Sequence, residues 1–169
     1  PHLFVDCHTT NGSKHQYSLT YDIPHNPATA EPIRTFLREK IMPVVTERMK
    51  EKGQLTFYYG NFNREHTNWT TYGYEPRYRK EYVGLRGRLA ILSEAYSYLD
   101  YQGRIFATKD FVAGLLDYMT ENAYAVHKLL DAVDEELVKT ANSEPARVAM
   151  SLNAKVISFK QKFTVKGFK

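Results

Sequence analysis

The chain has 169 residues, of which 43% are hydrophobic and 25% are charged, so it is long enough for one domain with a substantial apolar core. Lys and Arg number 23 against 19 Asp and Glu, a moderate excess that gives no reason to expect a nucleic-acid partner. No apolar stretch approaches the roughly 20 residues that a membrane span needs, and the single cysteine, Cys7, excludes an internal disulfide without indicating a compartment.

The first part of the chain predicts a strand, a loop, a helix and a second strand. Residues 3–8 begin with a short apolar run suited to a buried strand and end in polar side chains. The polar segment 9–30 contains Asn-Gly and two prolines and predicts a long loop. Apolar residues recur at helical spacing over 31–52, where Pro43 is expected to kink or restart the helix. Residues 55–59 are β-branched and aromatic, as in a strand.

The second part predicts another loop, a buried strand and a long helix. Residues 60–87 are rich in Asn, Thr, Tyr, Arg and Gly, which favours a loop. Residues 89–92 form an apolar run that leads directly into Ser93 and Glu94. A helix is then expected from Thr108, a suitable N-cap, to about Val138.

This order of elements predicts an α/β fold, with a mixed sheet and helices on both faces. After Pro145 the composition changes to short alternating strands, so we divide the chain into a first unit over 1–142 and the start of a β-rich C-terminal segment over 143–169. The chain lacks an initiator Met and both ends read as strands already under way, which suggests a piece of a longer protein.

Two strand ends carry polar residues that are candidates for a site, namely His8 and Glu94. A histidine after a strand is usually a hydrogen-bonded loop or core residue, so His8 alone is a weak indication. Glu94 is stronger, because burying a carboxylate at the end of an apolar strand is costly unless it is paired or functional. The sequence contains no His-Glu-x-x-His, paired Cys-x-x-Cys, phosphate-binding P-loop or Gly-x-Ser-x-Gly motif.

Two segments resemble zinc metallocarboxypeptidases of the carboxypeptidase A type. Asp6-Cys7-His8-Thr9-Thr10-Asn11-Gly12 is similar to the Asp-x-His segment that supplies that family's third zinc ligand. Residues 84–98, which include Leu92-Ser93-Glu94-Ala95-Tyr96, look like the strand that delivers the catalytic glutamate, and their order and separation suit this assignment. The resemblance implies that the chain is the C-terminal part of such a catalytic domain, with a partial carboxypeptidase A-like fold.

The resemblance also implies roles for particular residues. His8 would be the metal ligand for zinc, oriented by Asp6, and Glu94 the general base that takes a proton from a zinc-bound water. Tyr72 would be the mobile tyrosine of the catalytic site, with Tyr74 and Tyr78 as competing assignments.

The remaining candidates concern the substrate, which the resemblance implies is a peptide cut at its C-terminus. Arg86 and Arg88 could hold a substrate carboxylate through bidentate hydrogen bonds, although a salt bridge to nearby acids is the alternative for each. Tyr74 is a third candidate for substrate binding. The resemblance favours a secreted or periplasmic location.

One departure from the family limits the expected activity. The His-x-x-Glu pair that supplies the first two zinc ligands is absent from this sequence. We therefore expect the remainder of the catalytic domain, upstream, as a partner, and we expect the isolated chain to bind zinc weakly or not at all. The main alternative is a non-catalytic carboxypeptidase-like domain that binds a peptide or glycan. A cysteine hydrolase using Cys7 and His127 is a remote third possibility, because no orienting partner is evident.

Overall fold

The computed structural model describes residues 1–10, 12–143 and 157–168. At its centre is a four-stranded sheet in the order β1 (Leu3–Thr10), β6 (Leu89–Tyr96), β2 (Leu19–Asp22) and β3 (Thr56–Tyr58). β6 is parallel to β1 and antiparallel to β2, and β2 is parallel to β3. β4 (Asn61–Phe62) and β5 (Trp69–Thr70) form a separate antiparallel ribbon. The predicted α/β class with a mixed sheet is thus confirmed.

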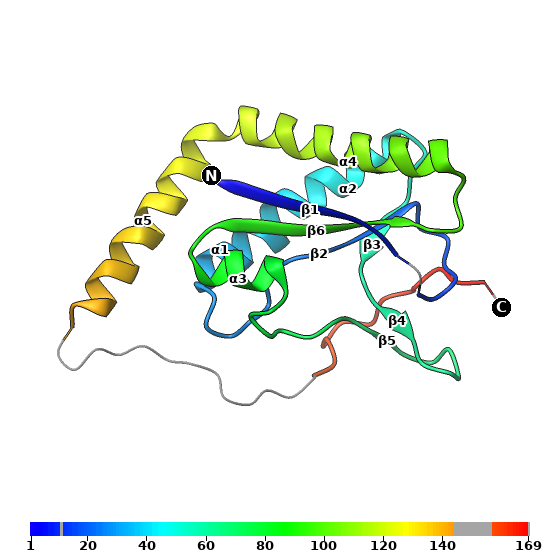
Figure 1. Cartoon of the computed structure of the whole chain (residues 1–169), viewed down its shortest axis with the longest axis horizontal. Helices are drawn as coiled ribbons and strands as arrows, with labels where there is room; N and C mark the ends of the chain where they lie inside the picture. Colours follow the sequence, from blue (N-terminus) through cyan, green and yellow to red (C-terminus); the bar gives the residue numbers. More distant parts are fainter. Residues whose placement is uncertain (11, 144–156, 169) are drawn as a thin grey trace.

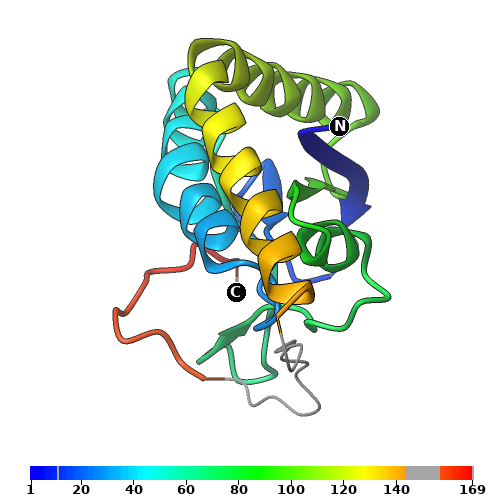
Figure 2. The ribbon, with the colours of Figure 1, turned by 90° about the vertical axis from the view of Figure 1, so that its left-hand side faces the viewer.

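Helices cover both faces of this sheet. The larger layer contains α1 (Glu31–Phe36), the π-helical turn η1 (Leu37–Ile41), α2 (Met42–Glu51), α4 (Tyr101–Glu121) and α5 (Ala123–Ala141). The short helix α3 (Arg79–Leu85) packs against β1 and β6 from the other face, below the strands in Figure 1. Figure 2 shows α5 running down beside α1 from the end of α4. None of the helices in the described parts of the chain has the length and apolar character needed to cross a membrane.

The hydrophobic core lies between the sheet and the larger helical layer. Side chains alternate along a strand, so every second residue of each strand points into this core. The strand contribution comes from Leu19, Tyr21, Leu89 and Ile91, which pack on Ile33, Leu37, Ile41, Val45, Met49, Phe111 and Leu115 of the helices. Full burial of one such side chain contributes about 1.5–3 kcal/mol. The intervening strand residues face α3, and among them are the candidate site residues.

The predicted helices are present, but three details differ. The helix over 31–52 passes through η1 immediately before Pro43, and this wider turn accommodates the missing N–H of the proline. The predicted N-cap Thr108 is wrong: α4 begins at Tyr101, and the carboxylate of Asp100 accepts a hydrogen bond from the Gly103 N–H at 2.7 Å. Thr108 lies inside the helix. A break at Asn122 divides the predicted single helix into α4 and α5.

Both predicted long loops contain regular structure. β2 lies within 9–30, and β4, β5 and α3 lie within 60–87. The sequence of β2 is Leu19-Thr20-Tyr21-Asp22, which has no apolar run, yet all four residues are buried. This strand is buried because β6 and β3 flank it, and that neighbourhood is not encoded in its local pattern.

The predicted C-terminal β segment lies partly outside the described residues, at 144–156. Over 157–168 the described chain forms no strand and makes one isolated antiparallel bridge, between His15 and Gly167. The backbone N–H of Lys166 donates to the Tyr17 hydroxyl at 2.9 Å, and the Phe163 ring lies 6.2 Å from that of Phe57. These contacts attach this segment to the first unit.

Candidate functional site

The pairing of β1 with β6 brings His8 and Glu94 together. His8 is the direct register partner of Glu94 in the parallel ladder, and Thr20 of β2 is the partner of Glu94 on its other side. Register partners leave a sheet on the same face, so the three side chains form one row across β1, β6 and β2. The two strand ends singled out by the sequence therefore meet on the face that α3 partly covers.

Glu94 is a buried carboxylate, with 8% of its surface exposed. Burial raises its pKa to about 6, the charge of His8 lowers it and that of Asp6 raises it further. Within the described parts of the chain, no side chain or backbone group forms a hydrogen bond or ion pair with this carboxylate. A carboxylate with a pKa close to neutrality and a free oxygen is suited to accept a proton.

Asp6 orients the imidazole of His8. The two residues are two apart on β1 and share a face, and Nε2 of His8 lies 3.1 Å from Oδ1 of Asp6. Nη1 of Arg79, on α3, is 3.5 Å from the same oxygen. The His8 side chain is 49% exposed, so its other ring nitrogen is accessible. A carboxylate on one nitrogen of a histidine is the usual support for metal binding through the other.

Tyr59 is a neighbour of Glu94 that the sequence analysis missed. Burial raises its pKa, as does the charge of Glu94, whereas a hydrogen bond with Thr10 lowers it. Its ring lies 5.6 Å from that of Tyr72, which in turn lies 5.5 Å from that of Tyr78. Tyr59, Tyr72 and Tyr78 thus form a row of rings that begins near Glu94, and Tyr72 is the exposed member. Among 13 tyrosines, nothing in the local sequence distinguishes Tyr59.

Arg86 and Arg88 do not join this group. Both precede β6, and the six residues from Arg88 to Glu94 span about 20 Å of extended chain. Arg88 forms a bidentate salt bridge with Asp134 of α5, with N–O distances of 2.7 and 2.9 Å. The guanidinium of Arg86 lies over the Tyr82 ring, 5.8 Å from its centroid. The expected role of these arginines in substrate binding therefore has no support in the geometry, and Arg88 has the alternative role of a salt bridge.

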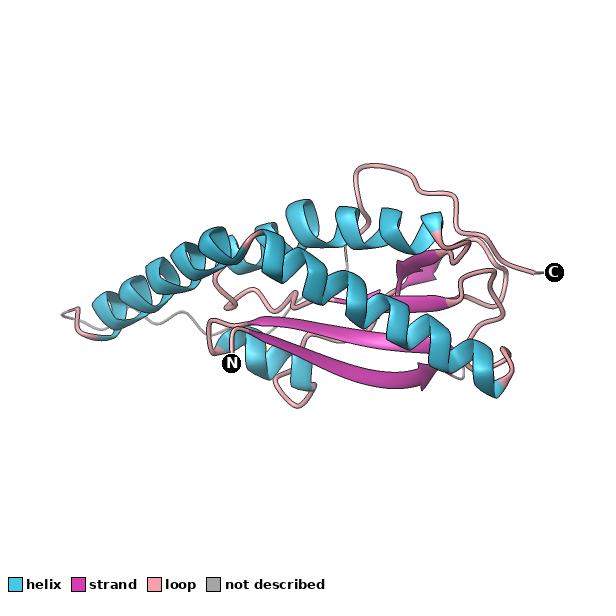
Figure 3. Ribbon diagram, turned by 90° about the horizontal axis from the view of Figure 1, so that it is seen from above, coloured by secondary structure: helices cyan, strands magenta, loops and turns pink. Residues whose placement is uncertain are grey.

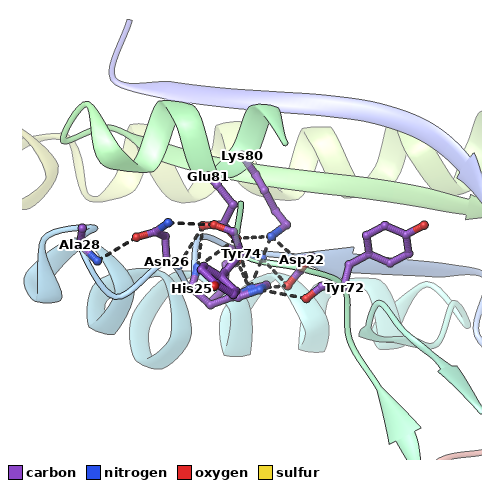
Figure 4. Close-up of polar contacts among 9 residues, drawn as sticks. Asp22, His25, Asn26, Ala28, Tyr72, Tyr74, Lys80 and Glu81 are labelled. Atoms are coloured by element: carbon purple, nitrogen blue, oxygen red, sulfur yellow. Dashed lines mark hydrogen bonds and ion pairs between the residues drawn. The ribbon is translucent and has the colours of Figure 1, made fainter. Parts of the chain in front are cut away.

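A buried polar cluster formed by Asp22, His25, Lys80 and Glu81 lies on the same face of the sheet (Figure 4). The Lys80 ammonium is 2.9 Å from Oδ2 of Asp22 and also contacts the Glu81 carboxylate. Glu81 accepts hydrogen bonds from the backbone N–H groups of His25 at 3.0 Å and Asn26 at 2.9 Å. The charges are thus paired and hydrogen-bonded, as buried charges must be. Because Lys80 and Glu81 belong to α3, the cluster joins that helix to the loop after β2.

The cluster also holds the segment that carries the candidate tyrosines. Nε2 of His25 lies 3.1 Å from the backbone oxygen of Tyr72, and Nδ2 of Asn26 donates to that of Tyr74 at 2.8 Å. The side chain of Tyr72 points away from the cluster in Figure 4 and is 48% exposed. The backbone of this segment is therefore fixed while the Tyr72 ring remains accessible.

The surroundings of His25 favour its protonated form. Burial lowers its pKa, but the hydrogen bond and charge of Asp22 together with Glu81 outweigh burial and the charge of Lys80, so the pKa is raised. Nδ1 lies 3.2 Å from the backbone oxygen of Ile23. Both ring nitrogens thus face carbonyl oxygens, which can only accept, and only the doubly protonated ring donates to both.

The described residues contain no group of three His, Cys, Asp or Glu side chains that could hold a metal ion. His8, with Asp6 behind it, offers one ligand position. Cys7 has the opposite orientation on β1, and burial, with the charge of Asp6, raises the pKa of its thiol. The His127 ring lies beside that of His2, 4.4 Å away, near the other end of the strand. A Cys7–His127 pair is therefore not assembled.

Comparisons of this chain with protein-family models, with curated proteins and with solved structures find no match.

Proposed function

We propose that this chain is part of the catalytic domain of a zinc-dependent metallocarboxypeptidase, which hydrolyses peptides at their C-terminus. The observation that carries the proposal is the pairing of His8 with Glu94 on one face of the sheet. An exposed histidine held by a carboxylate lies next to a buried glutamate whose pKa is raised to about 6. This combination suits metal-assisted activation of water.

In this proposal each residue has a distinct role. Zinc, when bound, would supply Lewis-acid chemistry, namely a lower pKa for a bound water and polarisation of the scissile carbonyl. His8 binds the ion, and Asp6 fixes the orientation of the imidazole. Glu94 accepts a proton from the attacking water and then donates it to the leaving amine. Tyr72, the most exposed of the three tyrosines, contacts the peptide.

The residues of this chain fit one part of a zinc site. A catalytic zinc ion normally has three protein ligands, and His8 is one. The proposal therefore requires further ligands from the remainder of the catalytic domain, within a longer polypeptide. By itself the 169-residue chain is expected to bind zinc weakly or not at all and to show no appreciable peptidase activity.

The test is to measure zinc content and peptide hydrolysis together in that longer polypeptide. Glu94→Gln keeps the shape of the side chain but removes the proton acceptor, so turnover should fall by about 10²–10⁴-fold while zinc content is unchanged. His8→Ala should lower both, and Tyr72→Phe should have the mildest effect. His127→Ala, which changes an exposed histidine on α5, is the matched control.

Two results would contradict the proposal. Full activity of Glu94→Gln would remove Glu94 from the mechanism, and equal loss of zinc in the Glu94 and His8 variants would make Glu94 a ligand or a structural group. A polypeptide that binds a peptide or glycan without zinc and without turnover would identify the alternative, a non-catalytic binding domain.

A further inference from the structure

α3 closes one side of the proposed site. The helix packs against β1 and β6, and Figure 3 shows it beside the start of β1, whereas His8 and Glu94 lie toward the other end of these strands. An enzyme that removes a single C-terminal residue needs a site that is blocked beyond that residue, while the rest of the peptide must leave on the opposite side. The leaving residue of the substrate therefore faces the side that α3 closes.

Arg79 reaches the site from this side. It is the first residue of α3, and its Nη1 lies 3.5 Å from Oδ1 of Asp6, the carboxylate that also holds Nε2 of His8 at 3.1 Å. Asp6 and His8 are two residues apart on β1, which corresponds to about 7 Å along an extended strand. The guanidinium is thus anchored within the reach of one amino-acid side chain from the proposed metal ligand.

Helix stability does not account for this arginine. A cation in the first turn of a helix is opposed by the helix dipole, and the Arg79 side chain is 73% exposed. A guanidinium carries five N–H donors, and among the described residues only Asp6 accepts from Arg79. The remaining donors are free to form the bidentate pair that arginine makes with a carboxylate.

The acidic residues near α3 already have partners within the described parts of the chain. The carboxylates of the buried polar cluster are paired with its lysine and its histidine. Glu75 lies 3.5 Å from Nη2 of Arg77. The carboxylate of Asp6 is divided between Arg79 and His8, so it does not fully neutralise the guanidinium. This side of the site therefore retains positive charge, which favours a carboxylate on the leaving residue.

We propose that Arg79 gives the site a preference for peptides whose C-terminal residue is glutamate or aspartate. The proposal rests on the function proposed above and names its substrate class. Every leaving residue also has an α-carboxylate, but that group is attached to the same carbon as the scissile nitrogen and is held close to the metal. A side-chain carboxylate extends farther, to the position that Arg79 occupies beside Asp6. Arg79 is thus a specificity-determining residue that takes no part in the proton transfers.

The test compares hydrolysis, by the longer polypeptide, of peptides that differ only in a C-terminal Glu, Gln or Leu. We expect kcat/KM for the Glu peptide to exceed that for the Gln peptide by about 10- to 100-fold, the range of a charge-assisted pair. Arg79→Ala should remove this ratio while zinc content and kcat/KM for the Leu peptide stay unchanged. Arg79→Lys should keep part of the ratio, because lysine has the charge without the bidentate geometry. Arg64→Ala, which changes an exposed arginine between β4 and β5, is the matched control.

Two results would overturn the role of Arg79 while leaving the proposed function intact. One is a wild-type ratio near one, and the other is an equal loss of activity on all three peptides in Arg79→Ala, which would assign the arginine to the α-carboxylate or to holding Asp6. Equilibrium binding of the same peptides to the Glu94→Gln variant provides a readout without turnover. Preferential binding of the Glu peptide, without hydrolysis of any peptide by the wild type, would support the recognition and reject the proposed function. Neither preference nor hydrolysis would overturn both.

Discussion

His8 and Glu94 are direct register partners in the parallel β1–β6 ladder, so a half-exposed imidazole and a buried carboxylate leave the sheet side by side. The charge of His8 lowers the pKa of Glu94, but burial has the larger effect, and the pKa rises to about 6. Ionisation of Glu94, which we propose as the general base, therefore destabilises the folded state.

That cost predicts that Glu94→Gln stabilises the folded chain at neutral pH. The carboxyl has a pKa of about 6 when folded and an ordinary value of 4.5, so the folded state prefers the protonated form. The cost is absent below pH 4.5, grows as pH rises to 6 and then stays constant at about 2 kcal/mol. Urea unfolding at pH 4.5 and 7.5 should therefore show a gain for the variant that is larger by up to this amount at pH 7.5. An equal gain in the free energy of unfolding at both pH values would contradict this account. So would a similar pH-dependent gain in the control Glu135→Gln, which changes an exposed glutamate.

The buried lysine predicts a large loss of stability. Lys80→Met leaves Asp22 and Glu81 buried without their shared cation, which should lower the free energy of unfolding by about 3–5 kcal/mol. Lys50→Met is the control, because Lys50 pairs with Glu47 at the surface, where solvent screens a salt bridge and little stability depends on it. Thermal and urea unfolding measure both. Similar losses of unfolding free energy in the two variants would show that the buried cluster does not hold α3 to the loop after β2.

The pKa of His25 predicts a pH-dependent attachment of the tyrosine segment. Since the folded pKa is raised above the ordinary 6.5, the stabilisation by the protonated ring is present below pH 6.5 and is lost as pH rises through the folded pKa. The ring then keeps one of its two donor hydrogen bonds, a change of about 1 kcal/mol. The amide signals of residues 72–74 in NMR spectra should shift with pH in this window. The shift should disappear in His25→Gln, and its persistence there would assign the titration to another group.

Two helical glycines, Gly84 of α3 and Gly114 of α4, are predicted to respond oppositely to substitution by alanine, because their surroundings differ in packing. A Cβ on Gly84 would lie 2.6 Å from Cβ of Pro24, a rigid ring, so Gly84→Ala should destabilise the fold by about 1–3 kcal/mol. A Cβ on Gly114 of α4 would meet no atom closer than 3.7 Å, so Gly114→Ala should stabilise it by about 0.5–1 kcal/mol. Melting temperatures of the two variants test this. A stabilising Gly84→Ala would mean that α3 is not seated on the loop after β2.

The sequence by itself determined the elements whose local pattern is strong. The apolar runs at the starts of β1 and β6 and the helical spacing over 31–52 predict the structure observed there, because burial requires those periodicities. The same patterns placed His8 and Glu94 at strand ends and singled out Glu94, since burying a carboxylate there is costly unless it is paired or functional.

Only the tertiary structure decided how these parts meet. β2 is buried because β6 and β3 flank it, although Thr20 and Asp22 give it no apolar pattern. The register that places His8 beside Glu94 and the position of Tyr59 near them depend on strands far apart in the sequence. Lys80 and Glu81 lie in a segment that the sequence predicts as a loop, and they are buried because Asp22 and two backbone N–H groups satisfy them there. Pairing and hydrogen bonding between distant segments leave no periodic signal in the chain, so local sequence patterns could not have predicted them.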